Sequence, residues 1–468
     1  MVRGLSRGLV AAAVALAAMR GGMAQDTRVV KEPKIPAACV VLKAELTTAV
    51  ATGGEIEARA EISGAGQAAL VDTARIQAAL DHCGKGMAVE LAADGEKAAF
   101  LVGPIQLRAG VVLLVDKGVT LYGTRNPEYY AVMPGSCGVV NDDSASGCRP
   151  LIAVVNATGS GIMGDGAIDG QGGAHLMVDG KAAAKSWWDL AEDARNAGRQ
   201  QVPRMIDTDL SDDFTLYRIT LRNSANFHVA FHRGDGLTVW GVKIDTPKTA
   251  RNTDGIDPAQ ARNITVTQSY IRTGDDNIAL KAGDGPTTNV SIVHDHFYWG
   301  HGVSIGSETN GGVSGVRVTD LSLDGPDNGI RIKSNASRGG LVEDVVYEDV
   351  CVRDSKNPIF FDTTYTFPGK AVGMIPVYQD ITLRDVRIVG GGRIQLNGFD
   401  TTHRIGVTLD GVVTLDGEKA YKASAIHTDL TLGPGPMNLV FTGDDSTVTG
   451  KAGSGKVEGC VGKFVGFP

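Results

Sequence analysis

The chain of 468 residues lacks the features by which several classes of protein are recognised. None of its six cysteines has CxxC or zinc-ligand spacing, so we predict no structural metal site. Beyond the first 24 residues, no apolar run of the length that a membrane span needs is free of charge or glycine. No Pro/Ser-rich linker and no block of like charge divides the rest, so we expect residues 25–468 to form a single domain.

The chain also has fewer basic residues than acidic ones. Lysine and arginine total 45 against 53 acidic residues, which gives a formal charge of −8. Residues 1–24 contain three arginines and no acid, so the chain without them would carry −11. Such a balance argues against nucleic acid or an anionic membrane as a partner. A polyanionic substrate would need cations concentrated at its binding site.

The first residues resemble an export signal. Arg3 and Arg7 precede an apolar run from Leu9 to Ala18, and Gly22 to Ala24 supply the small residues of a signal-peptidase site. The run is too short to act as a stable membrane anchor, and a buried helix is the alternative interpretation. We therefore expect residues 1–24 to be a signal peptide and the mature protein to be secreted, extracellular or periplasmic.

The cysteines suit an oxidising compartment. Cys137 and Cys148 are close enough in sequence to staple one loop, and Cys39 and Cys83 could clamp the N-terminal segment. Cys351 lies in an apolar run that resembles a strand, where a buried free thiol is an equally good interpretation.

One helix candidate stands out before a long series of β-rich segments. It begins at Asp72 in DTARIQAALDHC, where Asp72 can cap the first turn and Ile76, Leu80 and Cys83 fall on one face. Downstream, short segments such as FTLYRITL, LTVWGVKI and ITVTQSYI are bounded by Gly, Asn or Asp.

The β-rich segments repeat in register. Each has a polar anchor, a residue that tolerates a turn, and an apolar residue on either side of a variable one: DGIDP from Asp254, DNIAL from Asp276, HGVSI from His301, NGIRI from Asn328 and NPIFF from Asn357. The anchors lie 22, 25, 27 and 29 residues apart. A period that drifts in the twenties is typical of a parallel β-solenoid, whereas a propeller blade needs about forty residues and the Leu/Asn pattern of leucine-rich repeats is missing.

The predicted fold is therefore all-β, a right-handed parallel β-helix. A short capping helix from Asp72, within an N-terminal cap of about residues 25–90, would cover the open end of the solenoid against edge pairing.

The register concentrates acidic groups. Neighbouring coils of a parallel sheet lie about 4.8 Å apart, so Asp254, Asp276 and His301 should form a column that spans roughly 10 Å. Asp275 directly precedes Asp276. Mutual repulsion should raise at least one carboxyl pKa and leave a protonated acid beside ionised partners.

That pattern meets the needs of glycoside hydrolysis, in which one carboxyl group protonates the leaving oxygen and another activates water. A separation of about 6.5 to 9.5 Å between the two would give inversion. Arg331 and Lys333 flank Ile332, so both point to one side of the strand and suit a uronate carboxylate. Taken alone, NTDG is typical of a turn, GDDN could be a calcium-type loop, His301 could be structural, and RIK could be an exposed strand face.

Four motifs together resemble a known family. NTDGID at 252–257, GDDN at 274–277, GHG at 300–302 and RIK at 331–333 have the order and spacing of the polygalacturonases, the family 28 glycoside hydrolases. The resemblance extends over most of the chain after residue 24 and includes GAIDGQGG and SWW.

The resemblance implies catalytic roles for the column. Asp275 would donate the proton to the leaving galacturonate oxygen, and Asp254 and Asp276 would hold and deprotonate the attacking water. His301 would hydrogen-bond near the acid and keep it oriented.

The resemblance also implies substrate contacts. Arg331 and Lys333 would bind the carboxylate of the sugar next to the scissile bond, and Asn252 would contact substrate or water. A tyrosine is expected in the following coil. Tyr365 is the matching residue, with Tyr347, which is expected to be buried in its strand, as the competing choice.

The family uses no metal or organic cofactor, so the resemblance implies none here. The implied partner is polygalacturonate or pectin, and a monomer is the default state. The resemblance favours two disulfides and leaves Cys351 and Cys460 open; the two are Cys39–Cys83 and Cys137–Cys148.

The leading hypothesis is an endo-polygalacturonase that hydrolyses α-1,4 bonds of de-esterified homogalacturonan with inversion. Exo-action is an alternative if the inserts at 135–149, 175–204 and 308–316 close one end of the groove. A pectate lyase would need calcium ligands and an arginine base, which the paired aspartates and histidine do not suit. A non-catalytic polysaccharide-binding solenoid or adhesin is the remaining alternative.

Overall fold

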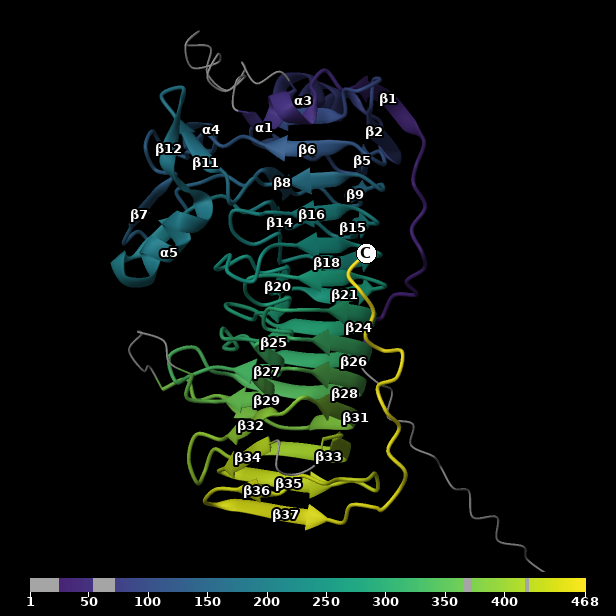
Figure 1. Ribbon diagram of the computed structural model, residues 1–468, viewed down its shortest axis with the longest axis vertical. Helices are drawn as coiled ribbons and strands as arrows, with labels where there is room; N and C mark the ends of the chain where they lie inside the picture. The colour runs from purple at the N-terminus through teal and green to yellow at the C-terminus, as the bar shows by residue number, and fades with distance from the viewer. Residues whose placement is uncertain (1–24, 54–71, 366–372, 417–420) are drawn as a thin grey trace, which may run out of the picture.

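The computed structural model describes residues 25–53, 72–365, 373–416 and 421–468. Its strands stack one above another along the long axis of the molecule, from the N-terminal coils at one end to the C-terminal coils at the other (Figure 1). The expected signal peptide, residues 1–24, lies outside the described residues. No helix in the described ranges is long and apolar enough to cross a membrane.

Two large sheets, parallel throughout, form the coils of a right-handed parallel β-helix, which confirms the predicted fold. The 12-stranded sheet carries the repeated motifs. Its strands are β4 (Ile105–Gln106), β8 (Ile152–Val155), β14 (Ile206–Asp209), β17 (Val229–His232), β20 (Ile256–Ala259), β23 (Ile278–Leu280), β25 (Val303–Ile305), β27 (Asn328–Lys333), β29 (Asn357–Asp362), β32 (Gly392–Asn397), β34 (Tyr421–Ile426) and β36 (Phe441–Thr442).

The 21-stranded sheet supplies the remaining sides of the coils. Its strands are β1 (Ala38–Lys43), β2 (Met87–Ala92), β3 (Ala99–Val102), β5 (Val111–Val115), β6 (Thr120–Gly123), β9 (Gly161–Met163), β10 (Ala167–Asp169), β15 (Phe214–Tyr217), β16 (Thr220–Arg222), β18 (Asp235–Trp240), β19 (Lys243–Asp245), β21 (Arg262–Thr267), β22 (Tyr270–Arg272), β24 (Thr287–Phe297), β26 (Val313–Asp324), β28 (Leu341–Arg353), β30 (Val377–Tyr378), β31 (Ile381–Val389), β33 (Ile405–Thr414), β35 (Thr428–Leu432) and β37 (Ser446–Gly450).

The core lies inside the coils and is built from ladders of aliphatic residues. In the 12-stranded sheet Ile256 pairs with Ile278, Ile278 with Val303, Val303 with Ile330, and Ile330 with Ile359. All five side chains are buried, and burial of each contributes about 1.5 to 3 kcal/mol. A shift of one residue would turn each of them to the outer face, so this ladder fixes the register.

Helix α3 (Thr73–His82) covers the N-terminal end of the solenoid, as predicted (Figure 1). Its Ile76 and Leu80 are buried, but the expected side-chain cap by Asp72 is wrong. The backbone of Asp72 is already helical, which turns its carboxylate away from the first turn. That carboxylate accepts a hydrogen bond from the backbone N–H of Leu101 at 2.7 Å and pairs with Arg75, so it ties the helix to the coil below.

Two of the inserts named above combine into one arm beside the N-terminal half of the solenoid (Figure 1). The first insert contributes β7 (Val139–Asn141), which pairs antiparallel with β13 (Arg199–Gln201) of the second. The second also carries the hairpin of β11 (His175–Val178) and β12 (Lys181–Ser186) and the helix α5 (Trp187–Ala197). The remaining helices are short: α1 (Thr48–Gly53) and α4 (Pro127–Tyr130).

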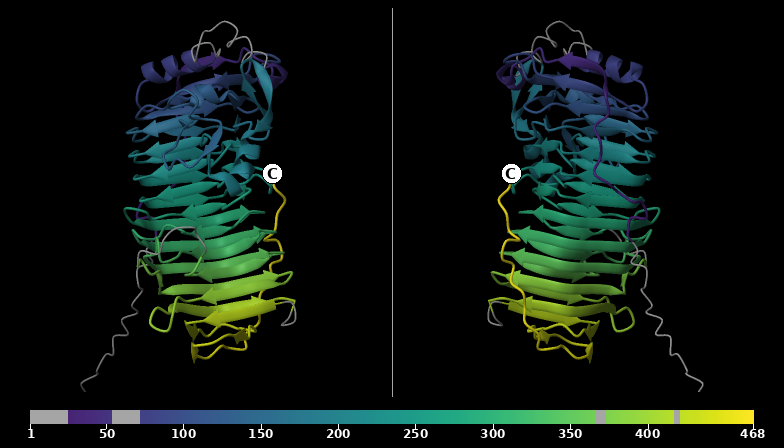
Figure 2. Two further views of the ribbon diagram at one scale, coloured as in Figure 1. Left: turned by 90° about the vertical axis from the view of Figure 1, so that its left-hand side faces the viewer. Right: turned by 90° about the vertical axis from the view of Figure 1, so that its right-hand side faces the viewer.

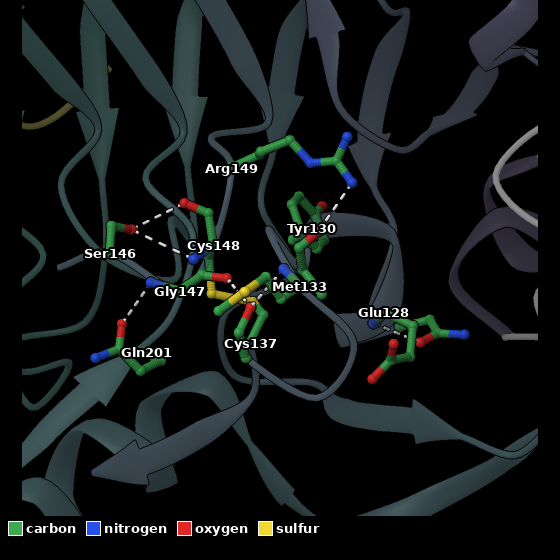
Figure 3. Close-up of a disulfide and its surroundings, with 12 residues drawn as sticks. Glu128, Tyr130, Met133, Cys137, Ser146, Gly147, Cys148, Arg149 and Gln201 are labelled. Carbon is green, nitrogen blue, oxygen red and sulfur yellow. Dashed lines mark hydrogen bonds between the residues drawn. A yellow bond between two sulfur atoms is a disulfide. The ribbon is translucent and has the colours of Figure 1, made fainter. Parts of the chain in front are cut away.

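A helix cap, a disulfide and a hydrogen bond between the inserts hold the arm together. Helix α5 starts with a capping box, in which Ser186 accepts from the backbone of Asp189 and Asp189 accepts from the backbone of Ser186. The disulfide Cys137–Cys148 closes the first insert, and the side chain of Gln201 accepts from the backbone N–H of Gly147 at 2.7 Å (Figure 3). The two inserts are therefore bound to each other as well as to the solenoid.

The described N-terminal segment, from residue 25, and the C-terminal segment run along the outside of the coils (Figures 1 and 2). Near the N-terminus, Asp26 accepts a hydrogen bond from Thr265, and its backbone N–H donates to Ser291. At the C-terminal end, Cys460 forms a disulfide with Cys351. The interpretation of Cys351 as a free thiol is therefore wrong, because the returning C-terminal segment brings a second cysteine to the outside of β28.

The other two disulfides, Cys39–Cys83 and Cys137–Cys148, are those that the resemblance favoured.

Candidate active site

The anchor column predicted from the register is present. Asp254, Asp276 and His301 each lie two residues before a member of the aliphatic ladder of Ile256, Ile278 and Val303. The strands that follow them, β20, β23 and β25, are neighbours in the 12-stranded sheet. The three polar groups therefore lie on successive levels of the solenoid, about 4.8 Å apart.

The turns before these strands need close backbone packing. A Cβ on Gly255 would lie 2.3 Å from the carbonyl oxygen of Asn277, and one on Gly302 would lie 2.1 Å from that of Gly329. Both distances are far below contact, so only glycine allows one coil to stack on the next at these positions. Asn252 has a φ of 55°, a left-handed conformation that asparagine tolerates.

Asp276 is buried, and both of its carboxylate oxygens accept hydrogen bonds. It accepts hydrogen bonds from Lys333 at 2.9 Å, Arg331 at 3.2 Å and the Ser304 hydroxyl at 2.7 Å. Burial alone would raise the pKa of Asp276, but Lys333, His301 and Arg331 outweigh it and hold the pKa well below its usual range. Asp276 is therefore a permanent carboxylate in this state.

Asp275 and His301 form a pair at the mouth of the site. The Nδ1 of His301 lies 3.1 Å from Asp275 Oδ1 and 3.4 Å from Asp276 Oδ1. Burial opposes charge on either group, but their mutual attraction lowers the pKa of Asp275 and raises that of His301 to about 9. In the structure without substrate the shared proton therefore rests on His301. Because the protonated Nδ1 of His301 is a donor, it cannot accept from Arg331, although Nη1 of Arg331 lies 3.2 Å away.

Asp254 is the acid whose pKa is raised. Burial, followed by the charges of Asp257 and Asp275, moves its pKa well above the usual range. Its Oδ1 is buried and has no hydrogen-bond partner in the structure. Repulsion between the acids was expected to raise one carboxyl pKa; at Asp254 burial is the larger cause and the neighbouring acids add to it, whereas the pKa of Asp275 is lowered.

A lysine that sequence reasoning missed sits beside Asp254. Lys281 forms an ion pair with Asp257, and its Nζ lies 3.5 Å from Asp254 Oδ2 and 4.2 Å from the centre of the Phe227 ring. Burial raises the pKa of Asp257 to about 6 against the pull of Lys281. The aligned segments contained the signal: Asp257 follows the inward-facing Ile256 and Lys281 follows Leu280, so both lie at outward-facing positions.

The structure brings the other predicted residues together only in part. Arg331 and Lys333 do lie on one side of β27, but both are buried and both contact Asp276. The ring of Tyr365 lies 5.4 Å from the guanidinium of Arg331 and 5.5 Å from Nζ of Lys333. Tyr347 is completely buried in β28, as expected for the competing choice. The proposed substrate contacts of these residues and of Asn252 stay predictions.

A groove of about 820 Å³ opens beside the column. Asp275 and His301 line it on one side, and Trp188, Asp189 and Glu192 of α5 line it on the other. Because one wall is the solenoid and the other is the arm, the groove exists only where the arm packs against the coils.

Within the described residues, one set of side chains has the spacing of a metal site. Ligand atoms of Asp275, Asp276 and His301 lie within 4.8 Å of one another. Arg331 and Lys333 already direct positive charge at Asp276, and His301 carries a proton, so the set fits a bound cation poorly.

Comparison with known proteins agrees with the motifs. The model of glycosyl hydrolases family 28 matches residues 83–432. An endo-polygalacturonase of Pectobacterium carotovorum subsp. carotovorum is 46% identical over 392 residues, covering 83% of this chain and 90% of the relative. A polygalacturonase of Ralstonia nicotianae is 36% identical over 516 residues, covering 98% and 95%.

A solved structure agrees in fold as well. The polygalacturonase from Erwinia carotovora ssp. carotovora matches 91% of this chain and 99% of its own, with 40% sequence identity and a TM-score of 0.69.

Proposed function

Since the chain belongs to glycosyl hydrolases family 28, we propose that it is an endo-polygalacturonase, a hydrolase of α-1,4-galacturonosyl bonds inside pectate chains. The single observation that supports this most directly is the column of acids that the coil register builds beside a groove lined by Asp275 and His301. The column offers ionised carboxylates, a proton-bearing pair and clustered cations, which are the groups that hydrolysis of a polyuronate needs.

In this proposal Asp275 acts on the leaving oxygen, and Asp254 and Asp276 act on the attacking water. Asp275, at the groove, gives its proton to the leaving glycosidic oxygen as the bond from that oxygen to the anomeric carbon breaks. Water adds to the anomeric carbon and loses a proton to the carboxylate pair of Asp254 and Asp276. Inversion follows if the donor and the base lie on opposite faces of the sugar with water between them.

The proton on His301 supplies the acid. Without substrate, Asp275 is ionised and His301 carries the proton across a contact of 3.1 Å. A uronate carboxylate entering the groove adds negative charge and removes water, and both effects raise the pKa of Asp275. The proton then moves from His301 to Asp275 and from there to the leaving oxygen.

Arg331 and Lys333 bind the carboxylate of the sugar beside the scissile bond in this proposal. Their contacts with Asp276 orient them before substrate arrives, and each has further N–H donors that these contacts do not use. Tyr365, close to both cations, and Asn252 complete the substrate contacts. The tight pairing with Asp276 keeps that group ionised for water activation.

The substrate class follows from the family, and because the chain carries a net negative charge, the cations that bind a polyuronate must be concentrated at the site. The three disulfides are consistent with an extracellular location. We further propose that residues 1–24 direct export and are then removed. The remaining chain, residues 25–468, would form one domain and act as a monomer.

The test is a time course of products from polygalacturonate. An endo-hydrolase releases reducing ends, forms a ladder of oligogalacturonates and thins the solution before many bonds are cut. Monomer or dimer as the sole early product would mean exo-action. Ultraviolet absorbance from a 4,5-double bond would mean elimination and would overturn the proposal.

A further inference from the structure

The solenoid side of the groove contains an arginine that the mechanism does not use. Arg251 lines the groove beside Asp275 and is half-buried. Its Nη1 donates to the carbonyl oxygen of Ala191 in α5 at 2.6 Å, so the guanidinium bridges the solenoid and the arm.

Arg251 differs from the other cations of the groove. Arg195 pairs with Glu192 at 2.7 Å, and Lys248 pairs with Asp327 at 3.1 Å. In the described part of the chain, Arg251 has no carboxylate within 4.0 Å. A guanidinium with one carbonyl partner retains further donors, and those of Arg251 lie at the groove. Its planar fork can bind a carboxylate through two parallel hydrogen bonds.

An oriented aromatic ring lies in the same groove. The Nε1 of Trp188 donates to the carbonyl oxygen of Ser224 at 2.8 Å, which fixes the direction of the indole. The ring packs over Gly172 and Gly173, where an added Cβ would lie 2.4 Å and 2.5 Å from ring atoms. The GQGG and SWW motifs therefore meet here, and together they place a flat apolar surface at the wall of the groove.

The position of Arg251 separates it from the cations of the catalytic site. Arg251 belongs to the coil of Asp254, whereas Arg331 belongs to the coil three levels further along. The guanidinium of Arg331 reaches back toward Asp276, and neither Arg331 nor Lys333 lines the groove that Arg251 lines. A carboxylate that binds Arg251 in this groove is therefore assigned to a different unit of the polymer from the one that binds Arg331 and Lys333.

We infer that Arg251 and Trp188 form a further subsite for a galacturonate unit, in which Arg251 binds the carboxylate and Trp188 packs against the apolar face of the sugar ring. This inference rests on the proposed function, because it takes the polyuronate as the ligand. It assigns the arm a role in binding: the second insert supplies Trp188 directly and holds Arg251 through Ala191.

The experiment compares Arg251→Gln with Arg218→Gln as a matched control. Arg218 is an exposed arginine that pairs with Asp165 outside the groove, so the control makes the same change of charge and size. Steady-state rates on polygalacturonate and the frequency of cleavage at each bond of end-labelled oligogalacturonates are measured for both variants. Thermal melting of each variant reports folding.

Loss of one charge-assisted carboxylate contact should lower kcat/KM on polygalacturonate about tenfold to a hundredfold in Arg251→Gln and leave Arg218→Gln at the wild-type value. Arg251→Lys should fall between, because it keeps the charge and loses the fork. The bonds cut in the oligogalacturonates should shift by at least one position in Arg251→Gln. The relative frequency of cleavage at each bond does not depend on the fraction of the enzyme that is folded.

Two outcomes separate the inference from the proposed function. If the wild type hydrolyses polygalacturonate but Arg251→Gln retains its cleavage pattern and its kcat/KM matches the control, the subsite is wrong and the function stands. If the wild type releases no reducing ends, the proposed function itself fails. A lower melting temperature with an unchanged cleavage pattern would give Arg251 only the structural role of holding α5, and would also overturn the subsite.

Discussion

Replacement of Lys281 with methionine should move the acid limb of the pH–activity profile to higher pH. Water activation needs Asp254 ionised, so activity rises as pH increases through the pKa of that group. Burial and the neighbouring acids raise the pKa of Asp254, and Lys281 is the cation that opposes them. Removal of this charge leaves the repulsion uncompensated and raises the pKa further.

The size of the shift follows from the contact. Two unit charges 3.5 Å apart interact by about 5 kcal/mol at an effective dielectric constant of about 20. Lys281 shares its charge with Asp257, whose pKa of about 6 lets it take up a proton once the lysine is gone. That protonation removes one repulsion, so we expect a net shift of about 1 to 2 pH units rather than the full Coulomb value.

The opposite substitution provides the control. Asp257→Asn removes an anion beside Asp254 and leaves Lys281 free to pair with it, so the acid limb should move to lower pH. The assay is kcat for release of reducing ends over a pH series, with Lys281→Arg as the charge-preserving variant. Equal shifts in Lys281→Met and Asp257→Asn, or a loss of kcat that is the same at every pH, would refute the reasoning.

Three further predictions concern the groove, the C-terminal segment and metal dependence. Gly173→Ala should displace the ring of Trp188, cost about 1 to 3 kcal/mol of stability and change the tryptophan fluorescence; unchanged emission would contradict the close packing. Cys351→Ser should lower the free energy of unfolding by about 2 to 4 kcal/mol, because the disulfide to Cys460 closes a span of 109 residues; an unchanged melting temperature would contradict this. Chelation of divalent cations with EDTA should leave hydrolysis unchanged, because Arg331, Lys333 and His301 already direct positive charge at Asp276 and Asp275; a loss that calcium restores would contradict it.

The parts of the molecule that repeat could be predicted from the sequence. The ladder from Ile256 to Ile359 depends on a short pattern that recurs once per coil, and the pattern alone aligns Asp254 with Asp276 and His301. The side on which Arg331 and Lys333 lie followed from strand alternation. The disulfides Cys39–Cys83 and Cys137–Cys148 were possible from their positions in the sequence, and the resemblance to a family favoured them over other pairings.

The parts that do not repeat could not be predicted in this way. The pairing of β7 with β13 places Gln200 of the second insert opposite Val140 of the first, and no period in the sequence connects the two. The Cys351–Cys460 bond depends on a C-terminal segment that turns back along the coils. Which acid carries a raised pKa depends on the full set of neighbours, because His301 overrides burial at Asp275 and no cation does so fully at Asp254.

The most direct test of the account is the rate at which Asp275→Asn releases reducing ends from polygalacturonate. The substitution keeps the size of the side chain and removes the proton that the leaving oxygen needs. The account predicts a loss of about a hundredfold to ten-thousandfold in kcat with an unchanged melting temperature. Hydrolysis at the wild-type rate by the folded variant would contradict the claim that the stacked acids of neighbouring coils form the hydrolytic centre.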